Sequence, residues 1–567
     1  MLTSLRLCAF TSALLLTSAA TVLAQPAAPP PASAQPGRVD ERFQQRPAAP
    51  SVGAPIDIPA QGAPAPGPAA QGVTFTVRAV AFEGNTTLSD AALQALAAPY
   101  TGRAISLADA NELAAKVTAA YRDAGYVLSR AVVPAQNVTD GTLHIRIVEG
   151  RIDQTKIQGN AGGARPFLES YGQRITASRP LTAQVLEREL LLASDLPGLN
   201  VRNVLTASQT TPGAADLTLV VDPKPVEGFI GADNHGSRYL GRYETQAAIF
   251  FNDAFGTGGR LGLNGVVTPD SGPDLAYGGA SFDQPLGGNG LRLFSAVSYA
   301  ATEPGAALRA LDSKGSALNA STSLSYPFIR SRDFNLQGSL GFEYHDVRSW
   351  NAAVDPLFSD HTRNLTATLY MNALDRFGGY STASATLVHG LSVLAATKDT
   401  DPNKSRVGAS GDFTHINFQV THEHPFGDRF SIMLGASGQT SFGDPLLASE
   451  QFSLGGDMFN RGFDPSEVTG DSGIAGRIEP RINLADKISL LSQVQLFGFA
   501  EGGEVWQAQS LAGVPDHQSL ASAGAGLRFF VANRMNVELA WARPLNRNVL
   551  AASNQASRFL FSVGMSF

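Results

Sequence analysis

Residues 332–346 read RDFNLQGSLGFEYHD, and apolar and polar side chains alternate along them. An alternation with a period of two is the pattern of a β-strand with one apolar and one polar face. The same pattern recurs in HINFQVTHE (415–423) and MNVELAWA (535–542), with Gly, Asp, Asn and Pro clusters between the runs. Residues 225–567 are therefore predicted to form antiparallel strands.

The C-terminus favours a membrane barrel over a soluble β-sandwich. Apolar residues alternate up to the terminal phenylalanine, as is typical of outer-membrane barrels: Phe559, Phe561, Val563, Met565 and Phe567. A soluble sandwich also alternates, but it rarely needs this many residues of strand. A spanning strand takes about 9–11 residues and its loops roughly double that, which predicts about 16 strands in a transmembrane antiparallel β-barrel.

The N-terminal 72 residues carry targeting and linker signals. Residues 1–24 have one charge, a short apolar stretch and a Val-Leu-Ala end, which predicts a signal peptide. The one cysteine, Cys8, would leave with it. Residues 25–72 hold twelve of the 33 prolines and cannot bury enough apolar surface to fold alone. One proline-free island, 37–46, has the composition of a short helix, and 47–72 is a linker.

Residues 73–150 and 151–224 share one order of predicted elements, β-α-α-β-β. In the first unit a strand at 75–85 precedes helices capped by Ser89 and Ser106, and strands at 126–138 and 141–152 follow. The second unit repeats this order, and its first strand also ends in Gly-Asn. Repetition at this spacing predicts a duplicated module.

Charge and motifs argue against several function classes. A net charge of −7 and a pI near 5.8 give no electrostatic case for nucleic acid. GDSG (470–473) resembles a serine-protease segment, but no histidine lies in the setting that this chemistry needs. His422 and His424 lie two apart on one strand, without an evident third metal ligand. We therefore predict no enzyme, no catalytic residue, no cofactor and no metal site.

The two modules, the barrel and the proline-rich extension together resemble the two-partner secretion transporters. These are the TpsB family, of the haemolysin/haemagglutinin secretion-activation (ShlB/FhaC/HecB) type, and the modules resemble polypeptide-transport-associated (POTRA) domains. The resemblance implies an outer-membrane barrel with periplasmic POTRA domains that secretes one partner exoprotein. It also implies that the helix at 37–46 plugs the resting pore, and that a long extracellular loop, here around 455–475, folds back into the barrel.

The family's loop tip carries a Val-Arg-Gly-Tyr type motif after paired glycines, and SLGGDMFNRGF (453–463) resembles it. The matching residues are Gly455, Gly456, Arg461, Gly462 and Phe463. Asn460 and Phe463 depart from the family's Val and Tyr. Asp471 and Gly473 would then bring the loop back to the next strand. The family's partner is an aspartate in a Phe-x-Asp-x-Gly pattern, where this chain has Phe499 and Glu501.

Strand parity supports Glu501 independently of the resemblance. Glu501 shares a face with Gln493 and Gln495, whereas Val494 and Leu496 take the opposite face. Glu501 therefore faces the lumen, although Phe497 and Phe499 share that face. An arginine can meet a carboxylate with two parallel hydrogen bonds, which lysine cannot do. We expect Arg461 to pair with Glu501.

The predicted function is secretion of an unfolded adhesin- or haemolysin-type exoprotein that the POTRA domains recognise in the periplasm. The remaining expected partners are outer-membrane lipid and, during biogenesis, the barrel-assembly machinery. Two alternatives stay open. A BamA-type insertase shares the Arg-Gly-Phe motif but usually carries more POTRA domains, and a diffusion porin would not need residues 73–224.

Overall fold

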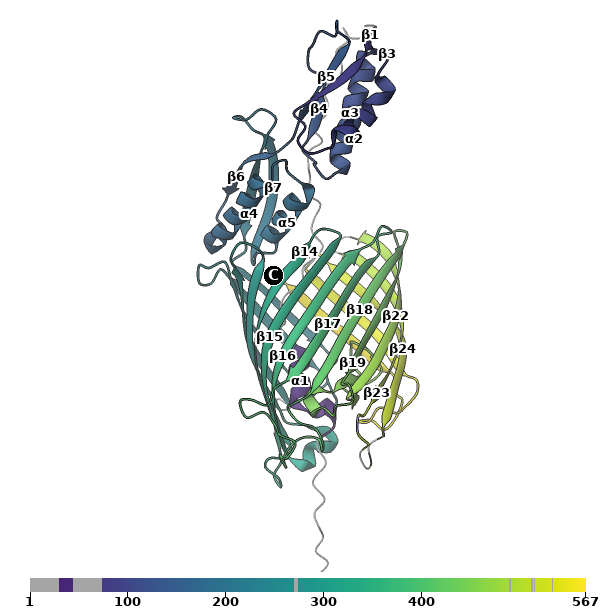
Figure 1. The fold of residues 1–567 in the computed structure, drawn as a ribbon. Helices are drawn as coiled ribbons and strands as arrows, with labels where there is room; N and C mark the ends of the chain where they lie inside the picture. The colour runs from purple at the N-terminus through teal and green to yellow at the C-terminus, as the bar shows by residue number, and fades with distance from the viewer. Residues whose placement is uncertain are drawn as a thin grey trace, which may run out of the picture.

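The computed structural model describes residues 30–43, 74–269, 274–488, 491–510, 513, 515–532 and 534–567. Two small α/β units stand in line at one end of a barrel, and helix α1 (Pro36–Phe43) lies inside it (Figure 1). The predicted signal peptide 1–24 and linker 47–72 lie outside the described residues. Of the predicted helix 37–46, the structure describes residues up to 43, and all of these are helical.

The first α/β unit has the predicted order with one strand more. Its elements are β1 (Thr74–Val77), β2 (Ala79–Glu83), α2 (Asp90–Ala97), β3 (Arg103–Ser106), α3 (Leu107–Asp123), β4 (Arg130–Val132) and β5 (Thr142–Val148). Strand β2 pairs in parallel with β5, which pairs antiparallel with β4. The predicted single strand 75–85 is wrong in one respect: it divides into β1 and β2, and β1 pairs with the unpredicted β3.

Both helix N-caps predicted in this unit are present. The Ser89 hydroxyl accepts a hydrogen bond from the Ala92 N–H at 3.3 Å. Ser106 accepts from the Asp109 N–H at 3.2 Å, and the Asp109 carboxylate accepts from the Ser106 N–H at 2.7 Å. This reciprocal capping box satisfies two N–H groups that the helix itself leaves unpaired.

The predicted strand 126–138 is much shorter in the structure. Strand β4 ends at Val132, two residues before Pro134, which has no N–H to donate to a sheet. Beyond the proline, the Gln136 side chain takes the place of a strand, because its amide donates to the His144 carbonyl and accepts from the His144 N–H, both at 2.7 Å. A side-chain amide thus satisfies the backbone that a longer β4 would have paired.

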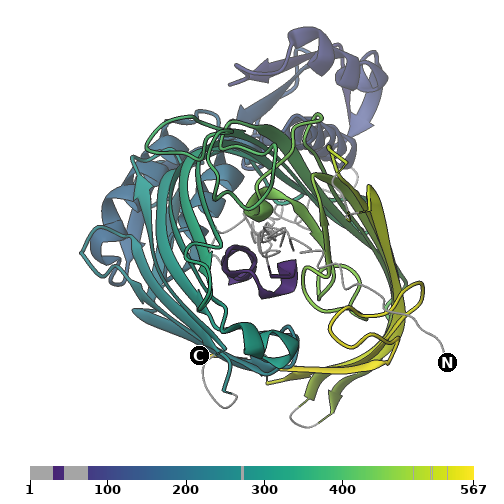
Figure 2. The same cartoon turned by 90° about the horizontal axis from the view of Figure 1, so that it is seen from below.

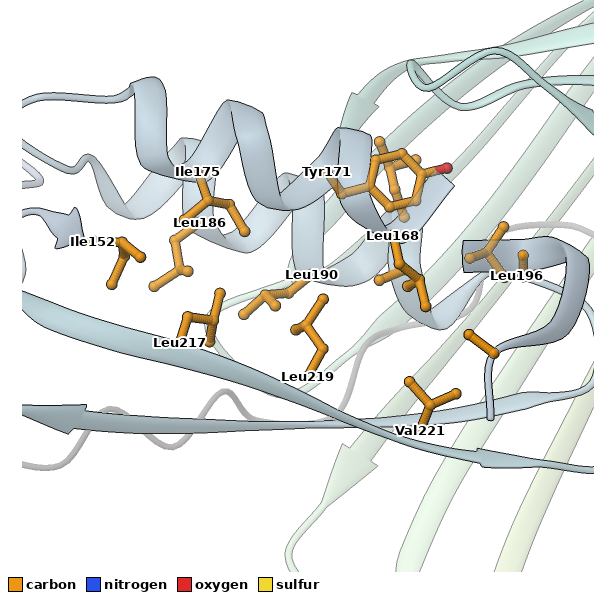
Figure 3. Packing of buried hydrophobic residues seen from close by; sticks show 14 of the residues in the cluster. Ile152, Leu168, Tyr171, Ile175, Leu186, Leu190, Leu196, Leu217, Leu219 and Val221 are labelled. Atoms are coloured by element: carbon orange, nitrogen blue, oxygen red, sulfur yellow. The ribbon is translucent and has the colours of Figure 1, made fainter. Parts of the chain in front are cut away.

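The second unit repeats the three-stranded sheet of the first. Its elements are β6 (Ile152–Gln158), α4 (Arg165–Ala177), α5 (Ala183–Ser194), β7 (Leu199–Ala207) and β8 (Ala215–Pro223). Strand β8 lies between β6, which is parallel to it, and β7, which is antiparallel. Figure 3 shows Leu168 and Leu190 of the helices packed over Leu217 and Leu219 of β8, all of them buried. The matched topology supports the duplication seen in the sequence.

Sixteen antiparallel strands form the closed barrel, as predicted. The strands are β9 (Val226–Asp233), β10 (Glu244–Asn252), β11 (Arg260–Val267), β12 (Leu275–Leu286), β13 (Leu291–Thr302), β14 (Lys314–Arg330), β15 (Phe334–Trp350), β16 (Phe358–Leu374), β17 (Tyr380–Gly390), β18 (Thr414–Phe426), β19 (Phe430–Thr440), β22 (Ser472–Ile488), β23 (Leu491–Trp506), β24 (His517–Val531), β25 (Met535–Pro544) and β26 (Arg558–Ser566). On β15, Leu340 faces outward and Asn335 is buried on the inner side, which matches the predicted faces.

The barrel closes where β26 pairs with β9. Phe567 and Gly228 exchange two backbone hydrogen bonds of 3.0 Å, so the terminal residue takes part in the closure. A Cβ on Gly228 would lie 2.2 Å from the Phe567 ring, which explains a glycine there. Phe559 and Met565 are exposed on the outer face, in line with Phe561 and Val563, whereas Leu560 points inward.

In the described part of the chain, no helix is both long and apolar enough to cross a membrane.

Candidate functional site: the barrel lumen

Helix α1 lies within the lumen against one side of the wall (Figure 2). Arg42 donates to both carboxylate oxygens of Glu244, at the start of β10, at 3.0 and 2.9 Å. Asp40 accepts from the Ser298 hydroxyl on β13 at 2.5 Å. One positively charged and one negatively charged side chain of α1 therefore each bind a polar side chain of the inner wall.

Helix α1 also packs against an apolar patch of the barrel wall. Val39 is buried there in one cluster with residues of β11–β16 and of the β9–β10 loop: Leu240, Val266, Leu275, Tyr277, Ala300, Ala317, Val347 and Phe358. The Tyr277 hydroxyl also donates to the Phe43 carbonyl at 3.1 Å. An eight-residue helix is marginal in water, so these wall contacts are what stabilise it.

A second segment enters the lumen from the long connection between β19 and β22. It is the loop 455–467, which we call the lumen loop. Strands β20 (Phe452–Leu454) and β21 (Val468–Gly470) pair antiparallel at its neck. Gly455 and Gly456 start the loop with φ of +112° and +88°, a region that disfavours side chains. A Cβ on Gly462 would lie 2.8 Å from the Pro544 backbone, so the tip lies directly against the wall.

Arg461, at the tip of the lumen loop, binds two glutamates of the wall. Its Nε donates to Glu501 of β23 at 2.8 Å and its backbone N–H donates to the same carboxylate at 2.8 Å. Its Nη2 donates to Glu479 of β22 at 2.7 Å. The exposed fraction is 4% for the Arg461 side chain and 0% for both glutamates, so all three charges are buried and paired.

The two phenylalanines that share the face of Glu501 also contact Arg461. The guanidinium carbon lies 3.8 Å from the centre of the Phe499 ring and 5.6 Å from that of Phe497. A cation over an aromatic face is attracted by the ring quadrupole. Phe497 and Phe499 therefore belong to the inner face as parity requires, and their apolar character there has a physical reason.

Glu479 is the site residue that the sequence analysis missed. It accepts from Arg461, from Arg528 of β24 at 2.8 Å and from Arg481 at 2.9 Å. The available signal was the alternation in GRIEPRIN (476–483), where Arg477, Glu479 and Arg481 share one face and Ile478 and Ile482 the other. Charges at alternate positions of a spanning strand mark the lumen face.

The remaining motif residues anchor the lumen loop around Arg461. Phe463 is fully buried with Phe459 and Val468, and its carbonyl accepts a hydrogen bond from Arg558. Asp464 lies between Arg558 at 3.3 Å and Arg238 at 3.4 Å. The Phe463 ring is buried in this apolar cluster.

Asp471 forms hydrogen bonds that hold the C-terminal end of the connection between β19 and β22. Its carboxylate accepts from Arg406 at 2.5 and 3.1 Å, from the Leu446 N–H at 2.9 Å and from the Ala508 N–H at 2.8 Å. The neighbouring Ser472 hydroxyl accepts from the Ser441 N–H at 3.1 Å, which is a structural role. A Cβ on Gly473 would lie 2.3 Å from the Phe452 ring, so this glycine lets β20 pack on β22.

The first α/β unit contains a polar network around Glu149. Glu149 accepts from the Thr86 N–H at 2.8 Å and from the Tyr121 hydroxyl at 2.8 Å. Burial opposes ionisation of Glu149, but the hydrogen bonds from Thr86, Thr87 and Tyr121 outweigh it and lower the pKa of this carboxyl. This network fastens the end of β5 to the loop before α2.

Comparisons with known proteins match both parts of the chain. The family described as haemolysin secretion/activation protein ShlB/FhaC/HecB matches residues 213–529, and the ShlB-type POTRA domain matches residues 75–150. The heme/hemopexin transporter protein HuxB of Haemophilus influenzae (strain 86-028NP) is 25% identical over 462 residues, which cover 79% of this chain and 80% of HuxB. The outer membrane transporter CdiB of Escherichia coli is 25% identical over 460 residues, covering 77% and 73%. The solved structure of CdiB from Escherichia coli has a TM-score of 0.70 at 22% identity, covering 90% and 94%, and thus the same fold.

Proposed function

Because the chain belongs to the haemolysin secretion/activation family ShlB/FhaC/HecB, we propose that α1 is the releasable plug of its secretion pore and the lumen loop a fixed part of that pore. The protein is an outer-membrane transporter that secretes a partner exoprotein, with its POTRA region in the periplasm. It is a secretion channel and not an enzyme. Outer-membrane lipid surrounds the apolar outer band, and the barrel-assembly machinery inserts the barrel.

The observation that carries the proposal is the position of α1 in the lumen. An extended polypeptide has to pass this space, and α1 is joined to the wall by a few polar contacts and by the apolar side chains of Val39 and Phe43. Residues 30–43 also precede the first α/β unit in the chain, so α1 can leave the lumen without breaking any strand of the barrel.

One contact joins α1 to the connection that carries the lumen loop. Arg38 is buried and donates to the Ala448 carbonyl at 2.5 Å. Ala448 belongs to the short helix η6 (Ala448–Glu450), only a few residues before β20. Movement of α1 therefore changes the hydrogen bonding of the same segment that holds the lumen loop.

A disulfide between α1 and this connection tests the proposal. A Cβ on Gly37 would lie 3.3 Å from the Ser449 Cβ, close to the roughly 3.5–4.5 Å of a disulfide. The Gly37→Cys/Ser449→Cys variant should fold, oxidise and stop secretion, and a reductant should restore secretion. Secretion is measured as exoprotein in the medium at matched barrel levels.

The matched control places a cysteine pair in the neck of the lumen loop. Ser453 and Thr469 are directly opposite on β20 and β21, so Ser453→Cys/Thr469→Cys fastens the loop without touching α1. This variant should still secrete when oxidised. If the Gly37/Ser449 pair is fully oxidised and secretion continues at the wild-type rate, α1 does not have to leave.

Recruitment of the unfolded partner fits the free sheet edges of the α/β units. Strand β7 has nine residues and is paired on one side only, with β8, among the described strands. An edge strand offers N–H and C=O groups to which an extended chain can add by β-augmentation. Such recognition does not need a folded partner or a deep pocket.

Site-specific photo-crosslinking can locate this contact on the full-length transporter. A photoreactive residue at Val204, exposed on β7, should crosslink to the unfolded N-terminal part of the exoprotein and not to its folded form. The same residue at Gln173, exposed on α4, is the control and should not crosslink. Equal yields at the two positions would exclude β7 as the recruiting edge.

A further inference from the structure

Three side chains with metal-binding atoms meet on the outside of the barrel, far from the lumen site. They are Asp375, in the turn after β16, and His422 and His424 on β18. One ligand atom from each lies within 4.8 Å of the others. The sequence placed the two histidines together but offered no third ligand, because Asp375 is more than 40 residues away.

Strand alternation puts all three residues on one face. Phe418 and Val420 of β18 are exposed toward lipid, and His422 and His424 continue this row toward the periplasmic end of the strand. On β16, Leu365 and Leu369 are exposed in the same way, and Asp375 follows at the same parity. The cluster therefore lies on the outer rim of the barrel, beyond the apolar band.

The first histidine is already oriented by a neighbour on β17. Ser381 pairs directly with His422 across the two strands, and its hydroxyl lies 2.9 Å from His422 Nδ1. That hydrogen bond leaves Nε2 as the nitrogen that is free to bind an ion. A hydrogen-bonded second nitrogen is the usual arrangement of a metal-ligating histidine, because it fixes the ring and its tautomer.

Asp375 is held in a similar way. One of its oxygens, Oδ1, accepts from the Phe377 N–H at 2.8 Å and the Gly379 N–H at 2.9 Å. The other oxygen lies toward His422, since a Cβ on Gly379 would be 2.5 Å from Asp375 Oδ2 and 3.0 Å from His422 Cε1. His424 stacks on His422 with ring centres 5.8 Å apart.

We propose that Asp375, His422 and His424 bind one divalent first-row transition-metal ion of the Zn²⁺ class. Two imidazole nitrogens and one carboxylate oxygen form a ligand set typical of Zn²⁺, and water fills the remaining position. Ca²⁺ and Mg²⁺ do not fit, because they take oxygen ligands and more of them. Ligands of one Zn²⁺ lie about 2.0 Å from the ion, and small rotations of these surface side chains close the remaining gap.

Zn²⁺ titration of the tag-free, full-length protein in detergent tests the site, with a chromophoric chelator as competitor. We expect one ion per chain. His422→Ala/His424→Ala should abolish this binding, and Asp375→Asn should weaken it at least about tenfold. Ser381→Ala, which removes the orienting hydroxyl, should weaken it about tenfold. Ca²⁺ and Mg²⁺ at the same concentration should not compete.

Two other exposed histidines provide the matched control. His389 on β17 and His517 on β24 lie at the opposite end of the barrel, so His389→Ala/His517→Ala should keep the bound ion. Heat-modifiability on gels shows that each variant is a folded barrel. The proposal is overturned if the wild type binds no Zn²⁺, if His422→Ala/His424→Ala keeps it, or if the control loses it equally.

Thermal unfolding gives a second readout. An ion shared by the turn after β16 and by β18 ties together two chain segments on either side of β17, and a ligand that binds only the folded state stabilises it. Zn²⁺ should therefore raise the unfolding temperature of the wild type and of the His389/His517 control. It should not raise that of His422→Ala/His424→Ala, and an equal rise there contradicts the assignment.

Discussion

Helix α1 and the lumen loop both occupy the lumen and both use arginines, but the wall holds them very differently. Arg42 of α1 is 26% exposed and pairs with one glutamate, whereas Arg461 is 4% exposed and joins two fully buried glutamates. The lumen loop is also tied to the barrel at both ends through β20 and β21, whereas α1 precedes the first α/β unit.

The difference suggests which of the two segments can move. Removing one partner of a buried, hydrogen-bonded ion pair leaves a charge without compensation, which typically costs about 3–5 kcal/mol. Loss of Arg461 leaves two such carboxylates, whereas loss of Arg42 leaves one, Glu244, which is 2% exposed. The Arg42 guanidinium is partly exposed, so its contacts can exchange with water as α1 leaves. The contacts of Arg461 are buried and cannot do so, which supports our proposal that the lumen loop is a fixed element beside which the exoprotein passes.

The largest expected effect is that of Arg461→Ala. It strands Glu501 and Glu479 in the wall, so the lumen loop should lose its position and secretion should fall at least tenfold, which corresponds to about 1.4 kcal/mol. Folded, heat-modifiable barrel should remain, because the strand ladder is untouched. Secretion is measured at matched barrel levels, with Arg348→Ala as control, since Arg348 forms an exposed pair with Asp355 and contacts none of the described residues of the lumen loop.

A double variant shows whether Arg461 and Glu501 act as one unit. The defect of Arg461→Ala/Glu501→Ala should be no larger than that of the worse single variant, because each single change already breaks the same pair. Arg461→Lys should be nearly as defective as Arg461→Ala, since lysine cannot reproduce the planar fork. Fully additive defects would mean that the two residues work separately.

The next effect in size concerns α1. Glu244→Ala removes the carboxylate that Arg42 binds, so α1 should leave the lumen more often while the lumen loop stays in place. We expect more frequent open-channel events in planar bilayers, greater antibiotic sensitivity and retained secretion. Asp355→Ala, which breaks an exposed pair with Arg348 outside the lumen, is the control. Unchanged conductance in Glu244→Ala would show that the pair of Arg42 and Glu244 does not hold α1 in the lumen.

Glu501→Asp should have an intermediate effect. The shorter side chain withdraws the carboxylate by one methylene from an arginine already at 2.8 Å. Glu479 still binds Arg461, so the guanidinium keeps one partner. Secretion should fall less than in Glu501→Ala. A wild-type level of secretion would show that the loop tip follows the carboxylate without loss.

The smallest effect is expected at Asn460. This residue is buried with φ of +71°, a conformation that costs most non-glycine residues about 1–2 kcal/mol and asparagine less. Asn460→Ala should lower the temperature at which the lumen loop becomes accessible to protease, with little change in secretion. Asn460→Gly should match or exceed the wild type. A more stable Asn460→Ala loop would mean that the asparagine side chain is itself unfavourable.

Much of the architecture could be predicted from local sequence. Period-two alternation and the terminal phenylalanine indicate the barrel, because each strand must be apolar outside and polar inside, and the strand count follows from length. The caps at Ser89 and Ser106 are local hydrogen bonds between residues three apart. Such features depend on neighbours in the chain, so they can be read from it.

The boundaries that were wrong depend on less local chemistry. Strand β4 ends early because the Gln136 amide pairs with the backbone of His144. Strand β1 forms because it can pair with β3. Neither partner is adjacent in the sequence. Residue propensities therefore predict strands correctly within 75–85 and 126–138, but they do not predict where these strands begin and end.

The sequence by itself determined the barrel, the duplicated α/β units and the candidates Arg461 and Glu501, because alternation and motif spacing are local. Only the tertiary structure decided that Glu479 and Arg528 join Arg461, and that Asp375 meets His422 and His424. The residues of each group lie on different strands. The order of these strands around the barrel and their register decide which side chains become neighbours. A closed sheet brings together residues that alternation assigns to a face but cannot assign to a partner.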